Sequence, residues 1–463
     1  MSWPMSGCAR PRHDRSVTRG PLVRGALSTC AFAVLSTTLS GCAVYHRKPL
    51  PPGPDLAGAA ALRVSAGNFG LPGLKAVSLD PKKGFSAVNL MELAVAGDPQ
   101  LSAARARAGV AGAQLLAAGL LPDPQISAGW SKSPVHTGYS IGVMEDVRAL
   151  LTMPARKAAA AAGARQVNLE ILWQEWQVAE RARELFLQAR ESQRLRAVLA
   201  PELRLLTELV ARDERELARG EVGSGSVAAE LDEWNAAEKQ WRALALQDNL
   251  IWHDIDGLLG LEPGTRLRLR AGGGLHSLSS HRFHAALLTL PRRRPDLLAL
   301  RAGYESTQER LRVQILRQFP MIDGGVHEAR SAEEGIQTIG FDVRLSLPLF
   351  NRNRGGIAIA RASRRYLYRL YQARLDAAVN QADQLFDAER IMRRQLHAAN
   401  ARFVRLEPAC KAARSSFQRG ELDLAKYTAV VADIASAQAQ IITLRASLAR
   451  ARSALDMLLA RPL

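Results

Sequence analysis

The chain repeats itself, because four short landmarks recur in the same order about 200 residues apart. The pairs are DPQL at 98–101 with RPDL at 294–297, Pro122 with Pro320, SIGV at 140–143 with TIGF at 338–341, and ARGE at 218–221 with QRGE at 418–421. Nearly constant spacing over four landmarks indicates two copies of one structural unit. We place the first repeat at 86–262, an inter-repeat loop at 263–282 and the second repeat at 283–463.

Each repeat is predicted to contain helices, then two strands, then a long helical hairpin. We expect the strands near 122–147 and near 320–347. The clearest strand alternates strictly, and its apolar positions are Ile339, Phe341, Val343, Leu345 and Leu347. About ten residues with one wholly apolar face are typical of a membrane-spanning barrel strand. A half-buried strand of a soluble sandwich is the alternative.

The remaining sequence favours long helices, since aromatic residues make up 5% of the chain and Ala, Leu and Arg dominate. Helical composition runs from Pro154, taken as a first-turn residue, to about Leu217, with a kink or break expected at Pro201. Near the C-terminus, apolar residues follow alternating three- and four-residue steps from Ile434 to Leu458. This heptad pattern predicts helix–helix packing.

The N-terminus reads as an export signal. Residues 1–24 hold five arginines and one acid, and an apolar run follows that is too short to span a bilayer. Leu39-Ser40-Gly41-Cys42 resembles the bacterial lipobox. We therefore predict a lipoprotein signal peptide at 1–41, lipidation at Cys42 and a linker at 42–85; a plain cleavage site with an unmodified cysteine is the alternative.

Charge and cysteine usage exclude several classes of protein. The formal net charge is +18, but export removes nucleic acid as a partner, and the arginines alternate with acids as on solvated helices. Removal of the signal leaves Cys42 and Cys410, so no disulfide framework is implied, and Cys410 is expected to be a small core residue.

No chemistry-bearing constellation is visible in the sequence. The histidines of the inter-repeat region, His276, His281 and His284, lack the spacing and neighbours of a known metal site. GSGS at 223–226 lacks the lysine and preceding strand of a phosphate loop. We predict no catalytic residue, no metal site, no cofactor and no enzymatic activity.

Four strands per chain cannot close into a barrel, and an open sheet edge is not tolerated in hydrocarbon because its amides have no water to bond. Several chains must therefore share one barrel. Three chains would supply twelve strands, enough to leave a lumen. The long hairpins would continue this barrel as a helical tube, so the expected object is a conduit for hydrophilic cargo.

These features resemble the TolC-like outer-membrane efflux factors over essentially the whole mature chain. The resemblance rests on the duplicated unit, the RGE turns, GLLPDPQIS, and LPLFNRNRGGIAIARA at 347–362, whose first part resembles the branch serving heavy-metal efflux of the cobalt-zinc-cadmium type. It implies a mainly α protein with membrane β, as a homotrimer with a twelve-stranded β-barrel in the bacterial outer membrane and an α-helical barrel in the periplasm.

The resemblance also implies partners and cargo. A periplasmic adaptor and a proton-driven inner-membrane pump of the resistance-nodulation-division type would complete a tripartite efflux system, with outer-membrane lipid around the barrel. Heavy-metal cations are the favoured cargo. Drugs or a secreted protein are alternative cargoes, and a lipid-anchored periplasmic coiled-coil scaffold is the alternative from a different class.

The barrel-to-helix junction is predicted at 348–355. Pro348 would end the strand by removing a ladder donor, and Asn351 and Asn353 would bond their own backbone in a turn. Gly355 and Gly356 would let the chain swing into the next helix. Arg352 and Arg354 would lie at the junction itself.

The periplasmic entrance is predicted at the two RGE turns. Gly220 and Gly420 would take the left-handed backbone conformation, each followed by a glutamate, Glu221 or Glu421. The resemblance implies aspartates six and nine residues after the second glycine, but this chain has Lys426 and Ala429 there. An acidic constriction is therefore in doubt: Lys426 either forms a basic ring or pairs with Glu221 or Asp423.

Overall fold

The computed structural model describes residues 45–58, 84–134, 137–270, 276–334 and 336–461. The chain divides into two compact units, Met1–Asp55 and Leu56–Leu463. The described part of the first unit is exposed chain without helix or strand, and the predicted signal peptide and Cys42 lie outside the described residues. All helices and strands named below belong to the second unit.

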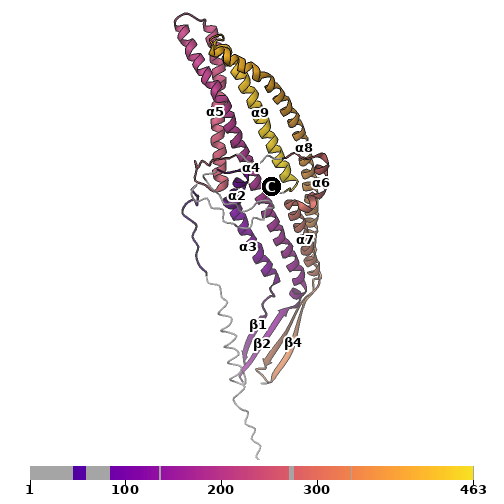
Figure 1. Ribbon diagram of the computed structural model, residues 1–463. Helices are drawn as coiled ribbons and strands as arrows, with labels where there is room; N and C mark the ends of the chain where they lie inside the picture. The colour runs from indigo at the N-terminus through magenta and orange to yellow at the C-terminus, as the bar shows by residue number, and fades with distance from the viewer. Residues whose placement is uncertain (1–44, 59–83, 135–136, 271–275, 335, 462–463) are drawn as a thin grey trace, which may run out of the picture. The chain divides into compact units, whose positions relative to one another are not determined.

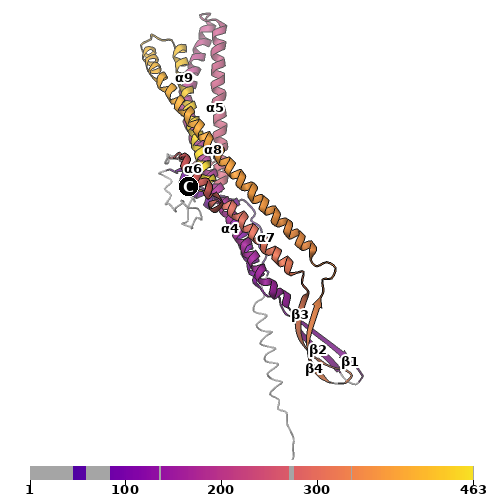
Figure 2. The same ribbon diagram turned by 90° about the vertical axis from the view of Figure 1, so that its right-hand side faces the viewer.

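The second unit contains the predicted pattern of two helices, two strands and two helices, twice over (Figures 1 and 2). The elements of the first repeat are α2 (Ala87–Gly97), α3 (Pro99–Gly119), β1 (Gln125–Lys132), β2 (Thr137–Asp146), α4 (Val147–Ala218) and α5 (Ser224–Leu259). Those of the second are α6 (Ser280–Arg293), α7 (Pro295–Leu316), β3 (Met321–Arg330), β4 (Gln337–Ser346), α8 (Arg354–Gln418) and α9 (Leu424–Leu458). The duplicated architecture is thus confirmed.

The strands form one antiparallel sheet in the order β1-β2-β3-β4. The two hairpins are joined where β2 of the first repeat pairs with β3 of the second, with Val143 opposite Val326. Each repeat contributes half of the sheet, so β1 and β4 are left as the outer edges.

Helices α4 and α8 occupy corresponding places in the two repeats but have different surroundings. Helix α4 contacts α2, α3, α5, α7 and α9, whereas α8 contacts α6, α7 and α9. Contact with α7 is close because small residues face each other: a Cβ on Gly303 would lie 2.7 Å from Gln166 Oε1, and the Ser306 hydroxyl donates to the Ala159 carbonyl at 2.8 Å. Helix α4 is therefore central in the helical layer and α8 is peripheral (Figure 1).

Apolar clusters hold the helices together, and a small one at Leu199, Leu244 and Ala435 joins α4, α5 and α9. The largest includes Leu90, Trp176 and Ile255, where α2, α4 and α5 meet. Another is centred on Phe283 and Phe386, whose rings stack with centroids 4.2 Å apart. The heptad residues Ala437, Ile441, Leu448, Ala451 and Leu455 of α9 are buried, which confirms the predicted seam.

The helix that contains Pro154 and Pro201 starts earlier than predicted and has no break at Pro201. Helix α4 begins seven residues before Pro154, because the Asp146 side chain accepts a hydrogen bond from the Ala149 amide and caps the helix directly after β2. The helix also continues through Pro201 without a break. A proline removes one helical hydrogen bond, and burial of flanking residues such as Ala155 and Leu199 offsets that cost.

The segments predicted as linker and inter-repeat loop are partly structural. Phe85, in the predicted 42–85 linker, is 2% exposed and exchanges backbone hydrogen bonds with the chain at Arg268 and Arg270. Leu267 and Leu269, in the predicted 263–282 loop, join the same core. Helix α6 already starts at Ser280, so His281 and His284 lie on a helix. Cys410, predicted as a core residue, is only half-buried.

Candidate functional site

The most unusual surface of the molecule is one face of the sheet. Pairing of the strands places the alternate apolar residues of all four strands on this face, in rows that run across the sheet. Phe341 is 85% exposed, Trp130 81% and Ile339 79%. The rows are Trp130–Tyr139–Arg330–Gln337, Ala128–Ile141–Glu328–Ile339 and Ile126–Val143–Val326–Phe341. A contiguous exposed apolar face of this kind marks a contact with lipid or protein.

The apolar face has the dimensions and borders of an outer-membrane barrel wall. Strands β3 and β4 each contain ten residues, and at about 3.4 Å per residue with a tilt near 40° they span about 25 Å. Trp130 and Tyr139 stand in the row nearest the β-turns, and the Tyr139 hydroxyl donates to Glu328 Oε1 at 3.0 Å. Phe319 and Phe350, 58% and 95% exposed, flank the other end. Aromatic borders of this kind lie at membrane interfaces.

The opposite face of the sheet is mainly polar, and side chains on it lie close to glycines of the neighbouring strands. His327 lies over Gly340, where a Cβ would come within 2.6 Å of His327 Cε1, and its Nδ1 is 2.7 Å from Asp342 Oδ2. A Cβ on Gly129 would likewise lie 2.8 Å from Ser140 Oγ. Glycine at these two positions therefore leaves room for the side chains of the neighbouring strands to lie close to the sheet.

The junction between β4 and α8 is built around Asn353 rather than around self-bonded turn residues. Asn353 adopts a left-handed backbone conformation with φ 50°, and Arg352 before it has φ 45°. The side-chain amide of Asn353 donates to the backbone carbonyl of Gln314 at 2.7 Å and to Gln314 Oε1 at 2.9 Å, which fastens the turn to α7. The prediction that Asn353 bonds its own backbone is therefore wrong.

Of the two glycines predicted to let the chain turn into α8, only Gly356 lies in a crowded site. A Cβ on Gly356 would lie 2.5 Å from Asn353 Oδ1, whereas open space surrounds Gly355. Strand β4 ends at Ser346, two residues before Pro348. Arg354 starts α8, its amide donating to the Asn351 carbonyl at 3.0 Å, and its side chain is exposed together with that of Arg352.

The two hairpin turns have the same backbone. Gly220 and Gly420 have φ values of 73° and 77°. In each turn the glutamate amide donates to a carbonyl five residues earlier, at 2.9 Å from Glu221 to Glu216 and 2.9 Å from Glu421 to Ser416. This is the usual glycine-based helix end, and it follows in both repeats from the shared RGE sequence.

Lys426 takes the second of the two arrangements foreseen for it. Its Nζ lies 2.7 Å from Asp423 Oδ2, while its amide donates to Asp423 Oδ1 at 2.8 Å, so Asp423 both caps α9 and neutralises the lysine. This hydrogen bond lowers the pKa of Asp423 and raises that of Lys426. At this level of the hairpin the two charges cancel.

Two buried or half-buried carboxyl sites were missed by the sequence reasoning. Burial raises the pKa of Glu180 on α4 to about 7, although the Ser453 hydroxyl of α9 donates to its Oε2 at 2.8 Å and Arg183 lies nearby. Glu230 on α5 has its pKa raised to about 7 by burial and by a hydrogen bond with Asp213 on α4. The only sequence signal for these sites is an acidic residue at a helix position that faces a neighbouring helix.

Within the described ranges, no three His, Cys, Asp or Glu side chains converge in a way that could hold a metal ion. His276, His281 and His284 are all exposed. None of the helices in the described part of the chain is both long enough and apolar enough to cross a membrane.

Comparison with known proteins gives a family pattern for part of the chain. Residues 289–461, nearly the whole second repeat, match the model of the outer membrane efflux protein family. No curated protein sequence matches the chain closely enough to count as a relative.

Several solved outer-membrane channels share the fold. CusC, whose structures describe the conformational changes that accompany folding and transmembrane channel formation, has a TM-score of 0.65 at 14% identity, covering 84% of this chain and 96% of its own. The CmeC channel of Campylobacter jejuni has a TM-score of 0.66 at 13% identity, with 90% and 95% covered. The open-state MtrE channel of Neisseria gonorrhoeae has 0.61 at 15%, with 90% and 98% covered. The resemblance to TolC-like channels is thereby confirmed.

Proposed function

We propose that three copies of this chain form the outer-membrane channel of a tripartite efflux pump. One observation carries the proposal: the four-stranded sheet has an exposed face on which apolar residues predominate, and two unpaired edges, β1 and β4. Such a sheet is stable in a bilayer only when its edges are paired, and pairing β4 of each copy with β1 of the next keeps the strands antiparallel. Three copies close a twelve-stranded barrel, with the polar face that contains Gly129 and Gly340 on the inside.

The long helices continue the conduit into the periplasm. Helices α4 and α8 contain 72 and 65 residues, so each reaches about 100 Å from the membrane end to the hairpin turns. The turns at Gly220 and Gly420 would form the entrance, with Glu221, Glu421 and the Lys426–Asp423 pair near it. A periplasmic adaptor and a proton-driven inner-membrane pump of the resistance-nodulation-division type would dock there, and a lipid on Cys42 would add an anchor in the outer membrane.

Heavy-metal cations are the cargo we favour. The sequence LPLFNRNRGG resembles the branch of the family that serves cobalt, zinc and cadmium efflux. The ion pair between Lys426 and Asp423 removes the objection that a ring of free lysines would repel cations. Drugs or a secreted protein remain the competing cargoes, because the inner-membrane partner largely sets cargo choice.

The channel proposal is tested by the mass and conductance of the detergent-purified protein. We expect a trimeric mass and steady ionic conductance in planar bilayers. Phe341→Arg should reduce insertion into bilayers, because a charge on the apolar face near mid-membrane costs about 2–4 kcal/mol per copy. Thr338→Arg, on the polar face of the same strand, is the matched control. A monomer that stays soluble without detergent once Cys42 is replaced would overturn the channel and favour the scaffold.

The cargo proposal needs a separate measurement. Cells that lack their own outer-membrane efflux channels and carry this chain with its cognate adaptor and pump should show increased tolerance of cobalt, zinc or cadmium salts. Tolerance of organic drugs alone would contradict the metal assignment and leave the channel intact.

A further inference from the structure

The helical layer has two free sides, just as the sheet has two free edges. On one side lie α3 and α5, each packed against α4; on the other lies α8, packed against α7 and α9. Figure 1 shows β1 on the same side as α3, and β4 on the same side as α8. We call these the α3/α5 side and the α8 side. A barrel shared by several copies brings the α8 side of one copy against the α3/α5 side of the next.

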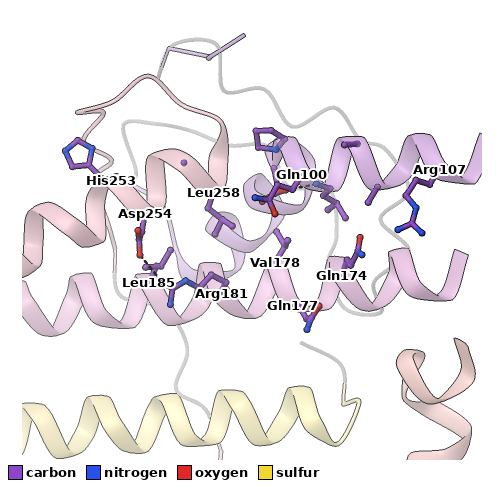
Figure 3. Close-up of a pocket in the computed structure, with 16 residues that line it drawn as sticks. Gln100, Arg107, Gln174, Gln177, Val178, Arg181, Leu185, His253, Asp254 and Leu258 are labelled. Carbon is purple, nitrogen blue, oxygen red and sulfur yellow. Dashed lines mark hydrogen bonds and ion pairs between the residues drawn. The ribbon is translucent and has the colours of Figure 1, made fainter. Parts of the chain in front are cut away.

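The α3/α5 side carries a groove of about 900 Å³ between α3, α4 and α5 (Figure 3). Arg107 of α3 and His253 of α5 lie at its two ends, and Gln100 and Gln177 line it between them. Arg181 is already bound to Asp254 at 2.7 Å. Among the described residues Arg107 has no ion-pair partner, so it is an exposed cation without a counter-charge.

The α8 side carries exposed acids at the same height. Asp376, Asp383 and Asp387 recur at seven- and four-residue steps, which places them on one face of α8, and all three are exposed. Asp387 is paired with Arg390 at 3.0 Å, but Asp376 and Asp383 have no ion-pair partner in the described part of the chain. They are anions without a counter-charge, opposite in sign to Arg107.

A series of contacts across the helical layer fixes this height. Arg105 of α3 binds Glu175 of α4 at 2.8 Å. Two residues earlier on α4, Trp173 lies 4.8 Å from the guanidinium of Arg294. Asp296, bound to Arg294, lies 3.9 Å from Arg374 of α8. Arg107 lies two residues beyond Arg105 toward the sheet, and Asp376 lies two residues beyond Arg374 away from it, so at about 1.5 Å per residue the two offsets add about 6 Å, which the length of an arginine side chain can bridge. In a ring with rotational symmetry, equal heights meet.

The membrane end of the two sides is also complementary. Leu120 and Leu121, just before β1, are 58% and 55% exposed, and Leu349 and Phe350, just after β4, are 63% and 95% exposed. Antiparallel pairing of β4 with the next β1 brings these two segments together. Between the two ends, α3 exposes mainly small residues such as Ala106, Gly109 and Ala113, opposite the exposed Tyr366 of α8, 64% exposed.

We infer that the groove of Figure 3 receives α8 of a second copy of this chain, with Asp376 paired to Arg107 and Asp383 directed toward His253. This inference rests on the proposed trimeric channel and names the surface that closes it. A heterologous contact of this kind, repeated around a ring, leaves no free side. Opposite charges would fix the register between copies and steer their encounter, so assembly should depend on salt concentration.

Charge reversal tests the pairing. We expect Arg107→Glu to weaken trimer assembly by about tenfold or more, because it places like charges together at each of the repeated contacts. The double variant Arg107→Glu with Asp376→Arg should restore the trimer. Arg310→Glu is the matched control, since Arg310 is exposed, has no ion-pair partner among the described residues and lies on α7 in the middle of the layer. Native mass spectrometry gives the oligomer, and circular dichroism confirms that each variant folds.

Cross-linking gives a second measurement that does not depend on destabilisation. With Cys410 replaced by serine, Arg107→Cys combined with Asp376→Cys should give covalent dimers and trimers when treated with a short bifunctional maleimide, which alkylates one thiol at each end, whereas Arg310→Cys combined with Asp376→Cys should not. A wild-type trimer that conducts, is unaffected by Arg107→Glu and forms no Arg107–Asp376 cross-link would overturn this contact and leave the channel proposal standing. A wild-type monomer without conductance would instead overturn the channel proposal.

Discussion

The α4–α5 and α8–α9 hairpins end in the same RGE turn, yet one end is fastened far more firmly than the other. In the second hairpin, Phe417 and Tyr427 stack at 4.5 Å, and Arg419 donates two hydrogen bonds of 2.7 Å to Glu421. Asp423 caps the helix that follows. In the first hairpin the residues at the stacked positions are Leu217 and Val227.

The rest of the first hairpin end is also weaker. Arg219 and Glu221 are 3.6 Å apart, and Gly223 at the start of α5 supplies no side-chain cap. The first hairpin instead has the half-buried carboxyl pair Asp213 and Glu230, where the second has Ala413 and Val430. A shared turn thus fixes the chain reversal, while the residues around it set how easily each end opens. We expect the first end to open more readily and in a pH-dependent way.

The largest expected effect concerns the different burial of α4 and α8. Glu180 of α4 is a half-buried carboxyl, whereas the equivalent residue of α8, Asn380, is exposed. Since the pKa of Glu180 is raised to about 7 in the folded protein, its contribution to stability is complete below the unfolded pKa and is lost as pH rises through about 7. Glu180→Gln should remove this loss, worth about 3 kcal/mol at most.

Calorimetry at pH 5 and pH 8 measures this effect. The difference in unfolding free energy between the two pH values should shrink in Glu180→Gln, and Glu208→Gln, at an exposed position of α4, serves as the control. An unchanged difference would mean that Glu180 is solvated and ionised in the folded protein.

The end of the second hairpin should open more easily when its stacked aromatic residues are replaced by the corresponding residues of the first hairpin. Phe417→Leu with Tyr427→Val removes the stacked pair and part of its buried area, and we expect the free energy of local opening to fall by about 1–2 kcal/mol. Amide hydrogen exchange over 410–430, compared with 210–230, measures it. Equal protection before and after the change would show that the stack does not hold this end.

Placing residues of the second hairpin at the corresponding positions of the first should make the end of the first hairpin harder to open. Asp213→Ala with Glu230→Val copies the second repeat and removes a carboxyl whose pKa is raised to about 7. Because the stability tied to this carboxyl is lost as pH rises through about 7, the variant should gain protection at pH 8 and little at pH 5. Exposure to solvent limits the gain to about 1 kcal/mol. Hydrogen exchange at both pH values is the measurement, and equal gains at both would contradict the role of titration.

The smallest expected effect is at the start of α5. Gly223→Asp would supply the cap that Asp423 provides in the second repeat, with a gain of a few tenths of a kcal/mol. Hydrogen exchange of residues 224–228 should slow slightly. Asp423→Gly is the complementary variant and should release both the α9 cap and Lys426; faster exchange at 224–228 in Gly223→Asp would show that the turn cannot accept the cap.

Local features were predictable because one segment contains all the information about them. The β4 alternation, the heptad seam of α9 and the left-handed glycines at 220 and 420 follow from backbone periodicity and from the freedom of a residue without Cβ. Prolines 154 and 201 misled the helix prediction, since burial of neighbouring residues outweighs a single lost hydrogen bond. Phe85 and Leu269 were assigned to connecting segments because their core partners are distant in sequence.

The sequence by itself determined that the chain is a duplicated helix–strand–strand–hairpin unit with membrane-type strands and matching turns. Only the tertiary structure decided that α4 is central and α8 peripheral, that the exposed apolar rows of the two repeats join on one face, and that Asn353 is fastened to Gln314. The physical reason is that periodicity is a property of one segment, whereas burial, pairing and pKa depend on neighbours. Two copies of the same sequence pattern therefore have different neighbours in the folded chain, and the repeated pattern alone does not specify those neighbours.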